Sequence, residues 1–202
     1  MEACCPPQPP AADRRYRWVL AVALVLNAAM FAIELAAGLG ARSASLLADA
    51  ADFAGDTANY GLSLGALALG PGWRSRAALI KGLSMGLYGI GVLAVTALNI
   101  SRGALPDAAT MGAVGLLALA VNVAVAVMLY RYSTGDADMR SVWLCSRNDA
   151  IGNVAVMLAA AGVFGTASGW PDYIVAAIMA TLALVASVSV VRQARREILQ
   201  PT

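Results

Sequence analysis

Three aspartates, Asp49, Asp52 and Asp56, lie within one apolar stretch that is long enough to cross a lipid bilayer. If that stretch is helical, the spacings of three and four residues place the three carboxyl groups on one face. An ionised carboxylate in hydrocarbon costs at least about 2.5 kcal/mol. We therefore expect a positively charged partner, most simply a cation, and we expect the rest of the chain to house the site that binds it.

The composition predicts a membrane protein. Of the 202 residues, 60% are hydrophobic and 13% are charged, whereas soluble domains contain about 25% charged residues. The net charge of +2 is too small to support nucleic-acid binding. The three cysteines, Cys4, Cys5 and Cys145, are too few and too badly spaced for a disulfide framework, and the chain has no histidine.

Six apolar stretches are long enough to span a bilayer, and we expect a helix in each. They cover residues 18–39, 45–69, 77–100, 111–132, 142–164 and 173–191, with short links that contain Pro71, Pro106 and Pro171. The predicted fold class is therefore an all-α polytopic membrane protein with six transmembrane helices. We expect a transporter domain at residues 17–192 between short tails at residues 1–16 and 193–202.

The basic residues predict the orientation. Eleven lysines and arginines fall on one side of this arrangement, only Arg42 and Arg102 fall on the other, and Arg147 lies within the fifth stretch. Because cytoplasmic loops carry the excess of basic residues, both termini are predicted to be cytoplasmic.

A second pair of candidate ligands lies in the fifth stretch. Cys145 and Asp149 are four residues apart, as are Asp52 and Asp56 in the second stretch. Two such pairs on two helices can supply four ligands in the tetrahedral arrangement that Zn²⁺ and Cd²⁺ adopt, and a thiolate favours such ions over Mg²⁺ or Ca²⁺. Three carboxylates and a thiolate carry excess negative charge, so metal binding should expel protons.

Three motifs carry a resemblance to a known family. They are Asn27-x-x-Met-Phe-x-x-Glu34, Ser43-x-Ser-Leu-Leu-Ala-Asp-Ala-x-Asp-x-x-x-Asp56 and Asn-Asp-x-x-x-Asn153, and with six helices they resemble the cation diffusion facilitator family. The resemblance implies proton-coupled efflux of Zn²⁺ or a similar ion such as Cd²⁺, Co²⁺ or Mn²⁺. It implies no enzymatic activity and no permanent cofactor. It assigns the metal to Asp52, Asp56, Cys145 and Asp149, in a multi-pass protein that we expect in a bacterial inner membrane.

The chain departs from the family pattern in ways that bear on selectivity and assembly. Asp52 and Cys145 stand where most zinc-transporting members have histidine, which favours Cd²⁺. A His-rich loop is missing between the fourth and fifth stretches, and we expect no cytoplasmic C-terminal domain. The homodimer typical of the family would then have to form through membrane helices.

Other polar residues are candidates for accessory roles. Asp49 could serve helix packing or the exit path as readily as ligation, and Glu34 and Asn27, on one face of the first helix, favour a structural role. Asn153 belongs to the motif of the fifth stretch. Cys145 alone could be a small packing residue, and its register with Asp149 favours ligation.

Two other functions fit part of the pattern. An intramembrane aspartyl protease could use Asp56 and Asp149 as a catalytic dyad, but it would leave Asp52 and Cys145 unexplained. A proton-coupled exporter of organic cations would need an aromatic-lined cavity, and only 6% of the residues are aromatic.

Overall fold

A computed structural model describes residues 14–66, 71–132 and 137–199, and all the regular structure in these ranges is helical. Within these ranges, the side chains of residues 66, 71–75, 77–78, 137–148 and 197 lie outside the description. The helices are α1 (Arg14–Ala41), α2 (Ala44–Ala66), α3 (Pro71–Ser101), α4 (Ala108–Tyr130), α5 (Ala137–Thr166) and α6 (Trp170–Leu199).

The six predicted helices are confirmed, but several extend beyond their predicted ends. Helix α3 begins at Pro71, which the sequence placed in a link. Proline is favoured at the first position of a helix, because the amide hydrogen that it lacks would have no partner there. Helix α6 continues past residue 191 to Leu199, with Arg196 in its last turn, where a basic side chain complements the helix dipole.

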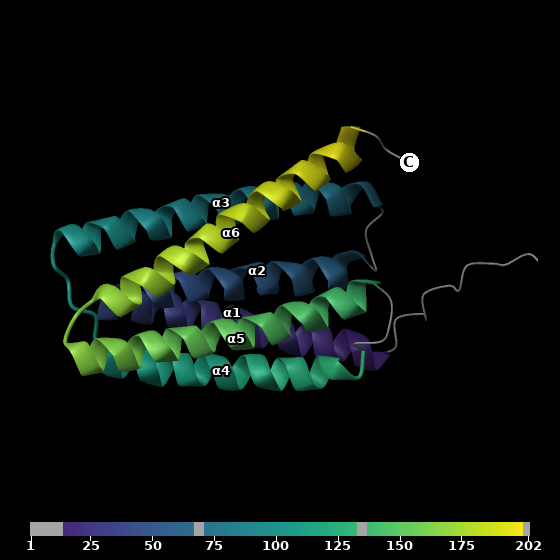
Figure 1. Cartoon of the computed structure of the whole chain (residues 1–202). Coiled ribbons are helices and arrows are strands. Elements are labelled where there is room, and N and C mark those ends of the chain that lie inside the picture. The colour runs from purple at the N-terminus through teal and green to yellow at the C-terminus, as the bar shows by residue number, and fades with distance from the viewer. Residues whose placement is uncertain (1–13, 67–70, 133–136, 200–202) are drawn as a thin grey trace, which may run out of the picture.

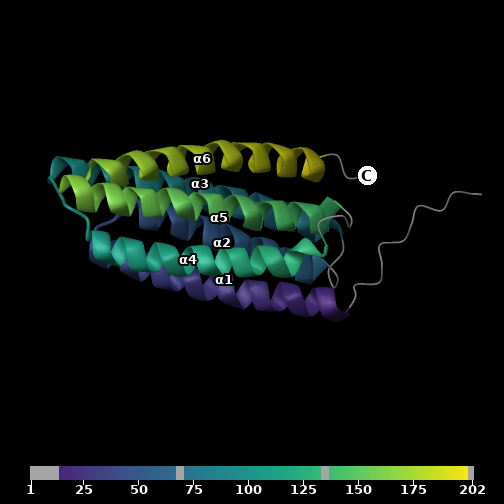
Figure 2. The same cartoon turned by 60° about the horizontal axis from the view of Figure 1, so that its bottom comes forward.

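Five of the helices contain segments that are long and apolar enough to cross a membrane. Helix α2 is the exception because it carries three aspartates. It runs through the middle of the bundle, in contact with α1, α3, α5 and α6, and so crosses the bilayer with them (Figures 1 and 2). The chain is therefore a polytopic all-α membrane protein, as predicted.

Helices α1 and α4 bury narrow stripes that include polar residues. On α1 the buried residues recur every three or four positions, and Asn27 and Glu34 are among them. On α4 the stripe includes Asn122. Large apolar side chains such as Val127 and Leu158 are exposed instead. Apolar side chains face outward and polar ones inward, as expected for helices surrounded by lipid.

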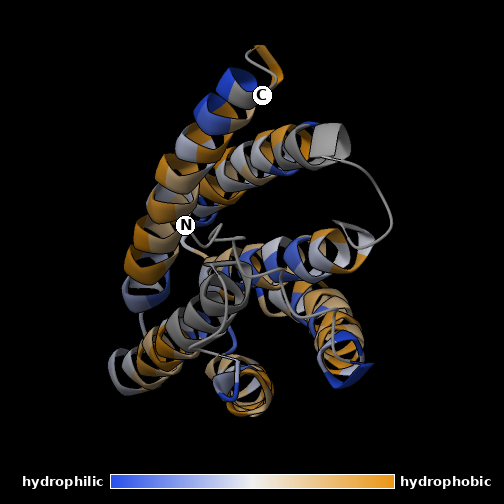
Figure 3. Ribbon diagram, turned by 90° about the vertical axis from the view of Figure 1, so that its right-hand side faces the viewer, coloured by the Kyte–Doolittle hydropathy of each residue, from blue (hydrophilic) through white to orange (hydrophobic). Residues whose placement is uncertain are grey.

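The helices form three closely packed pairs: α1 with α2, α3 with α6, and α4 with α5. We call the end at which α1 begins and α6 ends the near end, and the opposite end the far end. The near end carries the arginines that open α1 and close α6. Seen from this end, the last turns of α6 are hydrophilic (Figure 3). Arg42 and Arg102 lie at the far end, so the distribution of basic residues fits the predicted orientation.

The two ends differ in how closely α6 approaches α5. Figure 1 shows α6 meeting α5 at the far end and diverging from it toward the near end. At the far end, α6 packs on α2 and α3 through a buried cluster of small and apolar side chains: Ala44, Leu47, Ala48, Val92, Ala176 and Ala180. No described residue of α6 beyond Ala180 belongs to any of the four buried apolar clusters.

Candidate cation site

The three aspartates of α2 lie inside the bundle. Asp49 is fully buried, Asp56 is 5% exposed and Asp52 is half-buried. Asp52 lies close enough to repel the charges of Asp49 and Asp56. The helical spacing predicted from the sequence therefore stacks three carboxyl groups along the face of α2 that is turned toward the other helices.

Asp56 is the point at which α2 meets α5. Its carboxyl group lies within hydrogen-bonding reach of the Asp149 carboxyl on α5. It also accepts a hydrogen bond of 2.8 Å from the Tyr60 hydroxyl, one turn along α2. The charge of Lys81 on α3 lies close enough to act on Asp56, and the Lys81 ammonium donates a hydrogen bond to Asn59. Three helices thus bring charged groups together around Asp56.

Asp49 lies at the centre of a second polar group. Its Oδ2 accepts a hydrogen bond of 2.7 Å from Asn153 Nδ2 on α5. Asn153 Oδ1 accepts in turn a bond of 2.9 Å from Asn122 Nδ2 on α4. The fully buried Glu34 carboxyl of α1 faces Asp49. A polar chain therefore links α1, α2, α5 and α4.

The polar side chains buried between these helices offer more hydrogen-bond acceptors than donors. Among the described residues, five of the buried side-chain oxygens without a donor are carbonyl or carboxyl oxygens: Asn27 Oδ1, Glu34 Oε1 and Oε2, Asp49 Oδ1 and Asn122 Oδ1. A buried acceptor without a partner costs free energy, and a carboxylate costs more than an amide. Each of these oxygens can accept a hydrogen bond or coordinate a cation.

The structure brings some of the predicted residues together and leaves others untested. Asp56 meets Asp149, and Asp49 meets Asn153 and Glu34. Asn27 donates a hydrogen bond to the Ala23 carbonyl of its own helix. The Cys145 side chain lies outside the described residues. Among those that are described, no three Cys, Asp or Glu side chains are arranged to hold a metal ion.

Several residues that the sequence analysis did not select contribute to these contacts. Asn122 and Tyr60 could have been found, because one is a polar residue in the buried stripe of α4 and the other follows Asp56 by one helical turn. Asp172 was placed in a link. It is instead fully buried in the first turn of α6, where it binds the start of α2.

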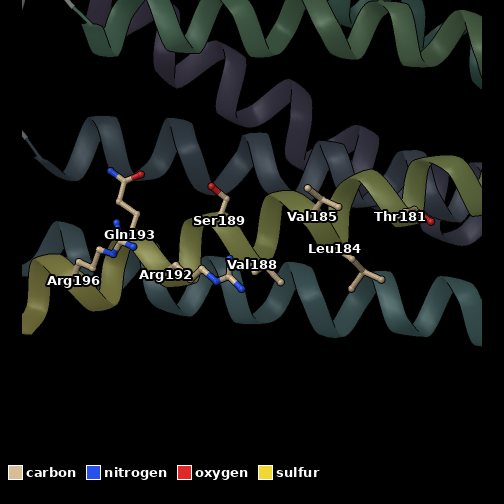
Figure 4. Close-up of a pocket in the computed structure, with 8 residues that line it drawn as sticks. All are labelled: Thr181, Leu184, Val185, Val188, Ser189, Arg192, Gln193 and Arg196. Atoms are coloured by element: carbon tan, nitrogen blue, oxygen red, sulfur yellow. The ribbon is translucent and has the colours of Figure 1, made fainter.

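A cavity of about 780 Å³ lies along α6 toward the near end (Figure 4). Its described lining comes from α6 between Thr181 and Arg196. No acidic residue is among this lining, and Arg192 and Arg196 are. This cavity is therefore distinct from the acidic groups of α2 and α5, and its basic residues disfavour cation binding there.

The comparisons with known proteins identify the chain over most of its length. A family model described as the cation efflux transmembrane domain matches residues 20–199, which include α2 to α6 in full and most of α1. No curated protein matches the chain.

Proposed function

The chain belongs to the cation efflux family, and on that premise we propose that it exports Zn²⁺ or Cd²⁺ from the cytoplasm in exchange for protons. Members of this family move metal cations across membranes, and the chain is accordingly an integral membrane protein with several spans. The choice of metal, the exchange for protons and the ligands are the parts of the proposal that need testing.

The proposed ligands are Asp52 and Asp56 on α2 with Cys145 and Asp149 on α5. The contact between the Asp56 and Asp149 carboxyls supports this assignment most directly, because two acids on different helices approach only if something positive holds them together. Without metal, a shared proton can do so. With metal, both carboxyls become ligands and the proton leaves.

The transport cycle follows from this exchange. Metal arrives from the near end, which the basic residues assign to the cytoplasm, and displaces protons from the acids. The helices then reorient around the site, and protons from the far side displace the metal. Asp49 and Glu34 lie beside the proposed ligand Asp52, where their carboxyl groups can accept the displaced protons, and Asn153 bonds to Asp49.

The test is metal uptake into inside-out vesicles with an imposed pH gradient, for Zn²⁺, Cd²⁺, Co²⁺ and Mn²⁺. We expect proton-driven uptake of at least Zn²⁺ or Cd²⁺ that is lost in Asp56→Ala and kept in Asp107→Ala, whose carboxyl lies at the surface of the far end. Both variants should elute from a sizing column like the wild type. An absence of flux for all four ions would remove the proposal.

The identity of the metal is tested at Cys145. Because a thiolate prefers Cd²⁺ and an imidazole suits Zn²⁺, Cys145→His should lower the ratio of Cd²⁺ to Zn²⁺ transport. An unchanged ratio would show that Cys145 is not a ligand.

A second candidate function draws on the same contact. A catalytic aspartyl dyad also needs two carboxyls sharing a proton, as Asp56 and Asp149 could. Family membership and the third acid, Asp52, favour the transporter. Asp52→Ala separates the two functions, since it should abolish metal transport and would leave a dyad intact.

The proposal extends to assembly and location. We propose a homodimer that forms through the membrane helices, in a bacterial inner membrane. Crosslinking in native membranes, followed by sizing of the solubilised protein, tests the dimer independently of transport.

A further inference from the structure

The start of α2 is held by a carboxylate from the other end of the chain. Asp172 Oδ1 accepts hydrogen bonds from Ser43 Oγ (2.7 Å), Ser45 Oγ (2.6 Å) and Ser45 N (3.0 Å). Its Oδ2 accepts one from Ala44 N (2.8 Å). We call Asp172 and these four donors the Asp172 clasp. All of its side chains are fully buried.

The chemistry of the clasp makes it strong and directional. The first amide hydrogens of a helix have no partner within that helix, and the positive end of the helix dipole lies at these amides. A carboxylate satisfies both needs, and hydrogen bonds to an ionised acceptor are about twice as strong as neutral ones. The Ser43 hydroxyl oxygen also accepts a bond of 3.1 Å from Leu46 N, which completes the cap.

The clasp joins helices that belong to two different closely packed pairs. Helix α6 pairs with α3, whereas α2 pairs with α1 and carries the three aspartates. Directly next to the clasp, Ala176 of α6 packs on Ala44 and Ala48 of α2. Toward the near end α6 diverges from α5, and its described residues beyond Ala180 join no buried cluster. The clasp therefore lies at the closed end of the bundle.

A transporter that releases its ion at the far end must open that end. In the structure the clasp and the packing of Ala176 close it, on the side of the acids away from the near end. We propose that Asp172 is the positioning residue of a gate at the far end: it holds the start of α2 against α6 while the cation site faces the near end, and it lets go when the ion is released. This inference rests on the proposed function, because a gate requires a cargo.

A fixed anchor is the alternative, and it predicts different behaviour. If the clasp never opens, weakening it loosens the whole bundle and exposes residues at both ends. If it is a gate, weakening it exposes the far end alone. Access of water-soluble reagents to each end therefore separates the two.

The experiment places one reporter cysteine at each end. Ala176→Cys reports on the far end and Ala194→Cys reports on the near end, because these alanines of α6 are 0% and 1% exposed. A membrane-impermeant maleimide is applied to right-side-out vesicles for the first and to inside-out vesicles for the second. The protein without either reporter gives the background from Cys4, Cys5 and Cys145.

The clasp is weakened by Ser45→Ala, which removes one side-chain donor and leaves the backbone bonds in place. Loss of one hydrogen bond to a charged group should raise the labelling rate of Ala176→Cys about tenfold or more. Labelling of Ala194→Cys should not rise. Ser101→Ala is the matched control, because Ser101 is exposed at the same end and its hydroxyl donates to Leu98 O of its own helix. Asp172→Asn should have a larger effect than Ser45→Ala.

Each outcome decides the question. Unchanged labelling of Ala176→Cys in Ser45→Ala, or a rise at both reporters, overturns the gate. If Asp172→Asn does not fold, Ser45→Ala alone carries the test. Labelling does not depend on the cargo, so faster labelling without metal flux would retain the gate and reject the proposed function. Metal flux with unchanged labelling would retain the proposed function and reject the gate.

Discussion

The far and near ends of the bundle are built from the same six helices but are held together differently. At the far end, hydrogen bonds join the turns: Asp107 N donates to Ala41 O, Asn99 Nδ2 donates to Arg42 O, and the Tyr173 hydroxyl donates to Ala104 O. The Asp172 clasp adds the start of α2. At the near end, the described part of α6 relies on α3, for example through Ser187 Oγ and Gly82 O at 2.6 Å.

This difference shows how a bundle of apolar helices can be closed at one end and divergent at the other. In lipid, apolar side chains gain little by meeting one another, so hydrogen bonds and close packing of small residues decide which helices stay together. The hydrogen bonds between the turns lie at the far end, whereas toward the near end Gly82 and Gly86 of α3 pack closely on Val191 and Ser187 of α6. The acidic residues of α2 lie between the two ends.

The largest expected loss of stability is in the middle of the bundle, where Asn153 links Asp49 to Asn122. Asn153→Ala should lower the free energy of unfolding by about 3 kcal/mol, because two buried polar groups each lose a partner. Denaturant titration in mixed micelles measures it. Asn99→Ala, which breaks one bond at the far end, should cost well under half as much, and equal losses would mean that the middle is no more tightly bonded than the turns.

Packing at the far end is tested by two glycines of α1. A Cβ on Gly38 would lie 2.9 Å from Leu47 Cδ2 and 3.1 Å from Leu47 N, whereas one on Gly40 would have no atom within 4 Å. Gly38→Ala should therefore lower the free energy of unfolding by about 1–2 kcal/mol. Gly40→Ala should be neutral or slightly stabilising. Thermal unfolding of both variants is the measurement, and equal melting temperatures would show that α1 and α2 can separate there at no cost.

A smaller effect is expected in the α3–α6 pair. Ser187→Ala removes the bond to Gly82 O, and hydrogen bonds between membrane helices contribute about 0.6 kcal/mol on average. Ser189→Ala, on the same helix but exposed, should change nothing. A loss at Ser187 as large as that at Asn153 would mean that the near end is held as firmly as the middle of the bundle.

The smallest effect concerns the turn before α4. Hydrogen bonds from the Thr110 amide, the Thr110 hydroxyl and the Ala109 amide lower the pKa of Asp107 from its ordinary value of 3.8. Its capping contribution is therefore complete above that value and is lost as the pH falls through the lowered pKa. The melting temperature of the wild type should fall slightly more than that of Asp107→Asn over this acid range. Parallel curves would show that the cap is not formed.

Much of the fold was predictable, because each apolar stretch is long enough to require a helix in lipid. The boundaries of the helices were less predictable. Pro71 can either end a helix or begin one, and which of the two occurs depends on the residues on both sides of it. The acids of α2 were predictable from local spacing, as was the meeting of α2 and α5. The role of Asp172 was not, because its partners lie 127–129 residues earlier in the chain and no local pattern marks them.

That separation in sequence has a consequence for biosynthesis. Ser43 leaves the ribosome 129 residues before Asp172, so the Ala44 and Ser45 amides at the start of α2 enter the membrane without their carboxylate partner and depend on interfacial water until the sixth helix is inserted. The start of α2 therefore gains its carboxylate partner only when the start of α6 has been made, and the membrane domain closes only when its final span is inserted.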